Sequence, residues 1–148
     1  MKIFLNHAAE DKSLVMPYYE RLKALGYEPW IDKRLLPGDK WDEEIQRAFN
    51  SADVYLIFLS SRSVTKRGYV QREIHDALEK QMYNLAGDIG LIPVLLDECE
   101  VPSKISSKYQ YVRLPDDWHL VVEALEKAAA QRTRGIQPRR HAGPLQIY

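Results

Sequence analysis

Short runs of β-branched and aromatic residues alternate along the chain with stretches in which apolar residues recur every three or four positions. The first kind of run is typical of strands and the second of amphipathic helices. The pattern predicts five strands, at Ile3–Leu5, Tyr27–Ile31, Asp53–Leu59, Ile89–Leu96 and Tyr111–Leu114. Strands that alternate with helices predict an α/β fold, a doubly wound parallel sheet with helices on both faces and right-handed crossovers.

Helical spacing follows the first strand, where one face of a predicted helix carries Leu14, Val15, Tyr18, Tyr19, Leu22 and Leu25. Gly26 is expected to end this helix, and Pro17, which lacks a backbone N–H, to kink it or delay its start. Asp39 is expected to cap a second helix. The apolar faces of the remaining helices are Trp41, Ile45, Ala48 and Phe49; Val70, Ile74, Ala77 and Leu78; and, within Asp116–Ala130, Trp118, Val121, Val122 and Leu125. Residues 60–68 form a predicted polar loop.

Composition agrees with one domain, because 148 residues of which 45% are apolar suffice for a single core. We assign residues 1–130 to this domain and 131–148, where helical periodicity ends, to a basic tail or linker that contains proline and glycine. The chain holds 21 basic and 21 acidic residues, but the tail carries four arginines and no acid, so the rest is net negative by four. An acidic domain argues against nucleic-acid binding, and such a tail is most simply a solvated linker.

Several kinds of site and location are excluded by what the chain lacks. Cys99 is the only cysteine, so an internal disulfide and a four-cysteine zinc site are both ruled out. The four histidines have no partners at metal-ligand spacing, so no metal is expected. No apolar run approaches the roughly 18 residues of a membrane span. The apolar part of the N-terminus is too short for a secretory signal, and a cytoplasmic location is expected.

Ligands of open parallel sheets bind outside the carboxyl ends of the strands. This rule selects the segments 6–11, 32–41, 60–69 and 97–102. No Gly-x-Gly-x-x-Gly or Gly-Lys-Ser/Thr loop follows the first strand, which argues against a dinucleotide fold or a P-loop. Leu59-Ser60 stands where a phospho-acceptor receiver needs an aspartate, and no Gly-x-Ser-x-Gly elbow of a serine hydrolase is present.

The same segments carry a series of short motifs in a fixed order. They are Phe4-Leu5-Asn6-His7, Trp30-Ile31-Asp32, Leu36-Pro37-Gly38 with Trp41, Leu59-Ser60 and Tyr69-Val70-Gln71-Arg72-Glu73-Ile74. In order and spacing the series resembles the TIR domain family, especially its bacterial members, over residues 2–127. The resemblance implies a flavodoxin-like five-stranded sheet. It also implies one of two functions, cleavage of NAD⁺ at the nicotinamide–ribose bond or non-catalytic assembly with other TIR domains.

Glu73 distinguishes these two functions. Catalytic members of the family carry a glutamate four residues after an aromatic, and Tyr69 and Glu73 occupy those positions. Helical geometry independently puts the two side chains beside each other on one flank of the helix. NAD⁺ would be the substrate, and no cofactor is implied. The alternative for Glu73 is an acid that merely stabilises the start of a helix. The family more often has tryptophan at position 69, and tyrosine offers a stacked ring less area.

The resemblance suggests four further substrate-binding residues, each with a structural alternative. His7 stands where the first loop of the family approaches the substrate, or it simply faces solvent in that loop. Asp32 binds ribose hydroxyls or closes a turn. Trp41 ends the loop after the second strand or begins the core face of the next helix. Ser60 binds ligand or satisfies backbone groups.

The expected product is ADP-ribose or a cyclic isomer, a signal for a downstream effector in prokaryotic immune and antiviral signalling. Self-association through TIR–TIR contacts is also expected, with the loop 32–40 as one contact. The alternatives are a non-catalytic TIR–TIR adaptor and a small-ligand sensor on the same scaffold.

Overall fold

The computed structural model describes residues 1–31, 41–65 and 90–136. Within these residues the strands form one sheet in the order β2-β1-β3-β4-β5, and every adjacent pair is parallel. The strands are β1 (Lys2–Asn6), β2 (Glu28–Trp30), β3 (Val54–Leu59), β4 (Leu91–Leu95) and β5 (Val112–Arg113). All five predicted strands are therefore confirmed, with ends shifted by one or two residues. The predicted doubly wound, flavodoxin-like α/β sheet is confirmed with them.

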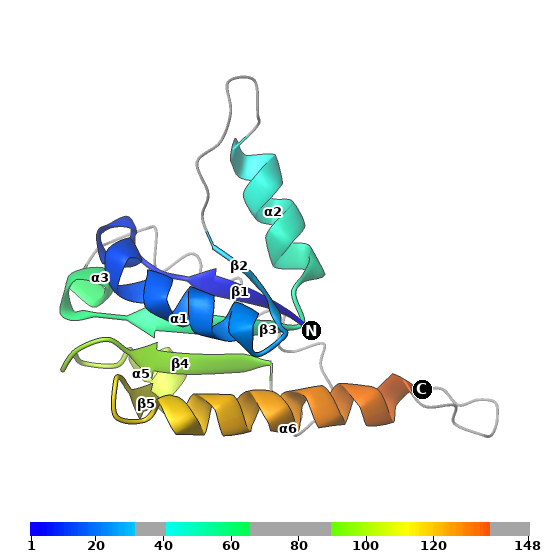
Figure 1. Cartoon of the computed structure of the whole chain (residues 1–148). Coiled ribbons are helices and arrows are strands. Elements are labelled where there is room, and N and C mark those ends of the chain that lie inside the picture. The colour runs from blue at the N-terminus through cyan, green and yellow to red at the C-terminus, as the bar shows by residue number, and fades with distance from the viewer. Residues whose placement is uncertain (32–40, 66–89, 137–148) are drawn as a thin grey trace.

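The described helical segments lie between the strands along the chain or after the last of them. They are the 3-10 turn η1 (Ala9–Asp11) and the helices α1 (Lys12–Ala24), α2 (Trp41–Ser51), α3 (Ser61–Thr65), α5 (Ser103–Ser106) and α6 (Trp118–Ile136). Figure 1 shows the start of α1 together with α3 and α5 at the end where the strand arrows point. The start of α1, the short α3 and the short α5 thus lie beside the carboxyl ends of the strands.

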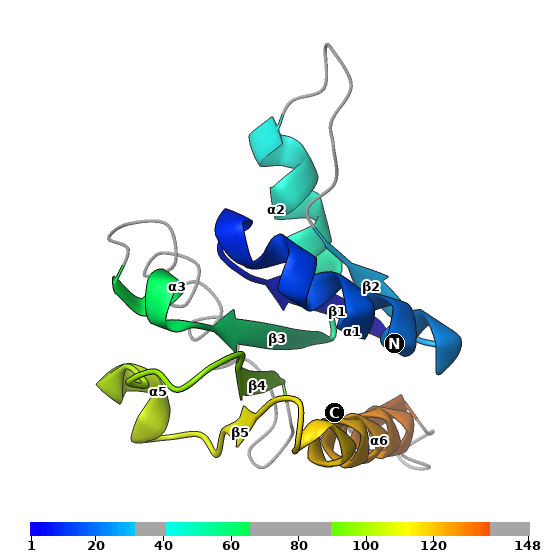
Figure 2. The ribbon, with the colours of Figure 1, turned by 60° about the vertical axis from the view of Figure 1, so that its left-hand side comes forward.

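Two apolar layers cover the sheet. On one face, Val15 and Leu22 of α1 and Val121 and Leu125 of α6 pack in a single cluster with alternate residues of β1 and β3. On the other face, side chains of α2 and Ile105 of α5 pack on the remaining strand residues. The two views of the ribbon show α1 and α6 running along the same side (Figures 1 and 2). All six residues of β3 are buried, as expected for a strand with a helix layer on each face.

The first helix departs from its predicted apolar face. Val15 and Leu22 are fully buried, but Leu14 and Leu25 are about half exposed. Val15 and Leu22 lie seven residues apart, two turns of one narrow stripe, and Leu14 falls beside that stripe. The helix begins at Lys12 and is not delayed by Pro17, which lies inside it. Gly26 follows its end at a φ of 93°, a conformation that glycine adopts without strain.

Two stretches expected to be irregular are helical. Residues 61–65 form α3, where a polar loop was predicted over 60–68. The last helix continues to Ile136, so Gln131 and Arg132, which we placed in the tail, are part of α6. The short α5 was not predicted at all.

The predicted helix carrying Tyr69 and Glu73 lies outside the described residues. Within the part of the chain that the structure describes, no helix is both long and apolar enough to cross a membrane.

Candidate functional site

The sheet reverses its winding between β1 and β3. β1 pairs with β2 on one side and with β3 on the other, so the connections that leave these two strands diverge. In open parallel sheets such a switch point is where ligands bind. His7 follows β1 and Ser60 follows β3, and both are buried. The two described residues predicted to bind substrate at strand ends therefore flank the switch point.

Ser60 immediately precedes α3 and caps its start. Its Oγ accepts a hydrogen bond of 3.1 Å from the backbone N–H of Ser63, and its own N–H donates to Ser63 Oγ at 2.8 Å. Its carbonyl accepts from Val64 N–H at 3.0 Å. This reciprocal arrangement satisfies donors that a helix start otherwise leaves unpaired. Of the two predicted roles for Ser60, satisfying backbone groups is thus seen in its contacts, and binding ligand stays a prediction.

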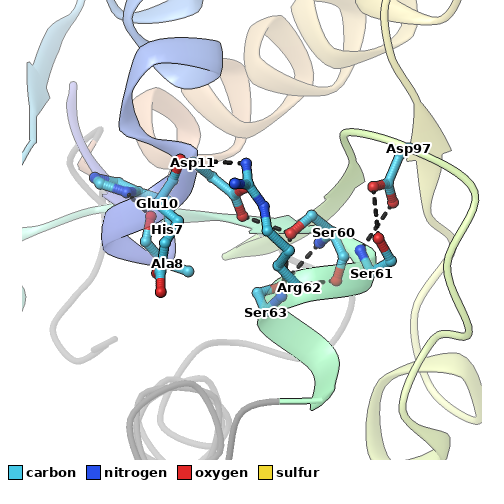
Figure 3. Close-up of polar contacts among 9 residues, drawn as sticks. All are labelled: His7, Ala8, Glu10, Asp11, Ser60, Ser61, Arg62, Ser63 and Asp97. Carbon is cyan, nitrogen blue, oxygen red and sulfur yellow. Dashed lines mark hydrogen bonds and ion pairs between the residues drawn. The ribbon is translucent and has the colours of Figure 1, made fainter.

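A buried carboxylate joins this helix start to the loop after β1. Asp11 is fully buried, and its Oδ2 accepts a hydrogen bond of 2.5 Å from the hydroxyl of Ser60. Its Oδ1 accepts one of 2.8 Å from the guanidinium of Arg62, which also donates to the carbonyl of Glu10 at 3.2 Å. Figure 3 shows Asp11 reaching across to Ser60 and Arg62. A buried charge is tolerated only when it is paired and hydrogen-bonded, and Asp11 has both kinds of partner.

His7 is held differently. Its imidazole is 4% exposed, and Nδ1 lies 2.8 Å from the carbonyl oxygen of Ala8. Its other ring nitrogen, Nε2, is buried and has no hydrogen-bond partner within the described parts of the chain. In Figure 3 the ring points away from Ser60 and Arg62. The side chains of His7 and Asp11 thus leave this turn in opposite directions. The carboxylate of Asp11 is hydrogen-bonded, whereas Nε2 of His7 has no partner among the described residues.

The acidic turn after β4 is tied to the same helix start. Asp97 accepts hydrogen bonds of 2.9 and 3.0 Å from the backbone N–H and the hydroxyl of Ser61. Beyond it, a hollow of about 630 Å³ is lined by residues that include Val64, Glu98 and Cys99. Burial, and then the nearby Asp97 carboxylate, raises the pKa of the Cys99 thiol. The thiolate is the nucleophile in cysteine chemistry, so Cys99 is poorly suited to that role.

The other predicted site residues are less fully described. Trp41 is the first residue of α2, and its side chain is not among the described ones. Asp32, Tyr69 and Glu73 lie outside the described residues altogether.

Sequence reasoning missed Asp11 and Arg62, although both lie in strand-end segments that it selected. An acid immediately before a predicted helix was the only available signal for Asp11.

Comparisons with known proteins identify the family. The model of the family described as TIR domain matches residues 3–129. Among solved structures, the chain is similar to the TIR domain of the Toll-related receptor TRR-2 from the lower metazoan Hydra magnipapillata. The two are 17% identical, with a TM-score of 0.66, over 84% of this chain and 97% of that chain. At this identity the likeness shows the fold alone. No curated protein matches the sequence. Because the family model covers most of its length, the chain belongs to the TIR domain family.

Proposed function

We propose that this TIR domain cleaves NAD⁺ at the bond between nicotinamide and ribose, releasing nicotinamide and either ADP-ribose or a cyclic isomer. The observation that carries the proposal is the glutamate at position 73, four residues after the aromatic Tyr69, in the segment that continues the chain from α3. That helix starts at the switch point, where ligands of such sheets bind. A buried, fully bonded Asp11 anchors its first turn to the loop after β1.

A single carboxylate suffices for this reaction. The nicotinamide ring of NAD⁺ carries a positive charge, so when the bond from C1′ to the ring nitrogen breaks, the electron pair neutralises the ring. No general acid is needed for the leaving group, in contrast to ordinary glycosidases, which use two carboxyl groups. The carboxylate of Glu73 would stabilise the oxocarbenium ion that develops on the ribose. Capture of C1′ by water, which loses a proton to solvent, gives ADP-ribose, and capture by a nucleophile of the same molecule gives a cyclic isomer.

The described residues beside the switch point are compatible with a reaction that needs no general acid. Asp11, beside the switch point, is bonded to Ser60 and Arg62, and His7 directly follows β1. Neither needs to act on a leaving group that departs unprotonated. Tyr69 supplies an aromatic face on which the nicotinamide or adenine ring would stack.

We further propose that assembly with other TIR domains contributes to activity, since members of this family commonly self-associate. The product would serve as a signal to a downstream effector in prokaryotic immune signalling. A non-catalytic adaptor is the competing function, and it requires the same assembly without Tyr69 and Glu73 acting on a ligand.

The test is incubation of the purified chain with NAD⁺, with nicotinamide, ADP-ribose and cyclic products separated by chromatography and identified by mass. We expect nicotinamide to form in step with one of the two ribose products. The measurement is made at low and high protein concentration, so that a need for assembly does not conceal activity. Complete retention of NAD⁺ by an assembled protein would favour the adaptor.

A further inference from the structure

The sheet ends in two edge strands. In the order β2-β1-β3-β4-β5, the strands β2 and β5 have a neighbouring strand on one side only, within the described residues. Figure 2 shows them at opposite edges of the sheet. The outer N–H and C=O groups of an edge strand are a template for another strand, and two copies of a chain can join their sheets there. What occupies these outer groups therefore determines whether this domain can associate edge to edge.

The outer side of β2 offers no N–H group. Backbone groups alternate sides along a strand. The N–H of Glu28 donates to the carbonyl of Met1 at 3.0 Å, so Glu28 faces β1. Its neighbours Tyr27 and Pro29 therefore face outward. Proline has no N–H, and the N–H of Tyr27 donates to the carbonyl of Leu22 in α1 at 3.1 Å. A partner strand thus finds no donor at these two outward positions.

The outer side of β5 is occupied by Asp117. The N–H of Leu114 donates to the carbonyl of Leu95 in β4, so Leu114 faces β4 and its neighbour Arg113 faces outward. The N–H of Arg113 donates to Oδ2 of Asp117 at 3.1 Å, and its carbonyl accepts from the N–H of Asp117 at 2.9 Å. The next outward residue, Pro115, lacks an N–H, and its carbonyl accepts from the first residue of α6 at 3.4 Å. One acid thus satisfies both outward groups of β5.

The contact made by the Asp117 carboxylate differs from the usual one at its position. An aspartate that directly precedes a helix ordinarily caps the first N–H groups of that helix. Asp117 directly precedes α6, and its carbonyl accepts from the N–H of Leu120 at 2.9 Å. Its carboxylate, however, bonds to the strand N–H of Arg113. The side chain therefore serves the edge of the sheet, whereas the backbone of the same residue serves the helix.

We propose that Pro29 and Asp117 close the two edges of the sheet to strand addition, so that copies of this domain associate through helix and loop surfaces and keep their sheets separate. The partner is a second copy of the chain, and the inference rests on the assembly proposed above. Strand pairing repeated from copy to copy leads to very stable fibrils. An assembly that follows mass action has to dissociate as the protein is diluted, which edges that stay closed permit.

The first test measures the β5 edge by amide hydrogen exchange. The N–H of Arg113 should be protected in dilute protein, because Asp117 holds it, and association should not protect it further. Asp117→Ala should raise its exchange rate about tenfold, the loss of one hydrogen bond to a charged group. Asp116→Ala makes the same change at the adjacent exposed acid and should leave the rate unchanged. If Asp117→Ala does not fold, Asp117→Asn keeps an acceptor oxygen and should raise the rate about threefold. Equal rates in the parent and the folded variant contradict the proposal.

The second test opens the β2 edge. Pro29→Thr supplies an outward N–H on a residue that favours strands. By light scattering, it should associate at a protein concentration at least about tenfold lower than the parent chain does, the effect of one added hydrogen bond. The new N–H at position 29 should become protected from exchange as association proceeds. Glu28→Thr is the matched control, because the N–H of Glu28 already bonds to Met1 and no outward donor is added. If Pro29→Thr does not fold, Pro29→Ala supplies the same N–H.

The outcomes separate this inference from the proposed function, because none of them depends on nicotinamide release. A parent chain that stays monomeric while Pro29→Thr associates contradicts the assembly proposed above but supports closed edges. A parent chain that assembles with new protection of the outward backbone groups of β2 or β5 overturns the proposal. A folded Pro29→Thr that associates no more readily than the parent also overturns it, whether or not the chain cleaves NAD⁺.

Discussion

The carboxylate of Asp11 accepts a hydrogen bond of 2.5 Å from the hydroxyl of Ser60, a residue 49 positions further along the chain. This contact joins the loop after β1 to the start of α3, and Arg62 reinforces it from the outside. The segments that follow β1 and β3, on either side of the switch point, are therefore joined by the hydrogen bond to the buried Asp11 carboxylate. Any ligand that binds there meets a loop whose position is set before binding, which lowers the ordering cost of association.

Replacing Asp11 by asparagine is expected to lower the free energy of unfolding by about 1–3 kcal/mol, because a buried charge-assisted pair is lost and Ser60 keeps a weaker partner. Arg62→Gln removes the other partner. Its side chain is 56% exposed, so we expect a loss below about 1 kcal/mol. Urea denaturation followed by far-UV circular dichroism measures both. Equal losses for the two variants would show that the ion pair, and not the buried bond to Ser60, holds the loops together.

Glu73→Gln is expected to retain the fold and to abolish nearly all nicotinamide release. The amide has almost the shape of the carboxylate but cannot stabilise a developing positive charge. We expect turnover below about a tenth of that of the parent chain, a loss of at least 1.4 kcal/mol of transition-state stabilisation. Nicotinamide is quantified by chromatography, with circular dichroism as the control for folding. A folded variant above that threshold would remove Glu73 from the catalytic role.

The aromatic at position 69 should act on affinity and not on the chemical step. Tyr69→Ala removes the stacking face and is expected to raise the KM for NAD⁺, whereas Tyr69→Trp enlarges the face and should keep or lower it. Initial rates over a range of NAD⁺ concentrations give both constants. Three proteins with the same KM would show that this side chain does not touch the substrate.

Activity is expected to depend on assembly. Specific activity should rise with protein concentration and with crowding, because self-association follows mass action. The double substitution Lys33→Glu with Arg34→Glu, in the loop proposed as a contact, should lower activity without loss of stability. Rates across a hundredfold dilution are compared with light scattering on the same samples. A constant specific activity from a monodisperse monomer would show that one chain is complete on its own.

The end of α6 is expected to matter for stability although it carries the basic composition of a tail. Arg132 donates hydrogen bonds to the carbonyl oxygens of Ala128 and Asp53, which ties the helix to the start of β3. Deleting residues 137–148 leaves these bonds intact and should change the unfolding free energy little. Deleting residues 131–148 should cost about 2 kcal/mol more, the value of hydrogen bonds to a charged group. Parallel urea titrations of the two truncated chains make the comparison, and identical midpoints would contradict it.

Periodicity predicted the sheet because β1, β3 and β4 are short and strongly apolar. Pro93 in β4 argues against a strand inside the sheet, because proline lacks the N–H of a ladder hydrogen bond. Gly90 and Leu96 form backbone hydrogen bonds to β3, since the carbonyl of Gly90 accepts from the N–H of Tyr55 and the N–H of Leu96 donates to the carbonyl of Leu59. The carbonyl of Leu95 points the other way and accepts from the N–H of Leu114, just after β5. Because backbone groups alternate sides along a strand, Pro93 faces the β5 side, where pairing begins only at Val94. The missing N–H therefore breaks no bond to β3.

The features that sequence did not predict depend on partners distant in the chain. The helix α3 is built from polar residues, and its start is secured by Asp11 from a different strand end. The last turns of α6 lack a clear apolar stripe, and Asp53 helps to hold them. The candidate site residues came from the order of short motifs. The burial of His7 follows from packing around the end of β1, which a linear pattern does not record.

Among the described helices α6 is synthesised last, yet its Val121 and Leu125 share one apolar cluster with Val15 of α1. A nascent chain that has been translated only as far as Arg113 therefore exposes the face of β3 and β4 that α6 covers in the finished domain. Apolar surface exposed at this stage promotes aggregation. Emergence of the complete α6 from the exit tunnel is thus the event that lets this domain close its core.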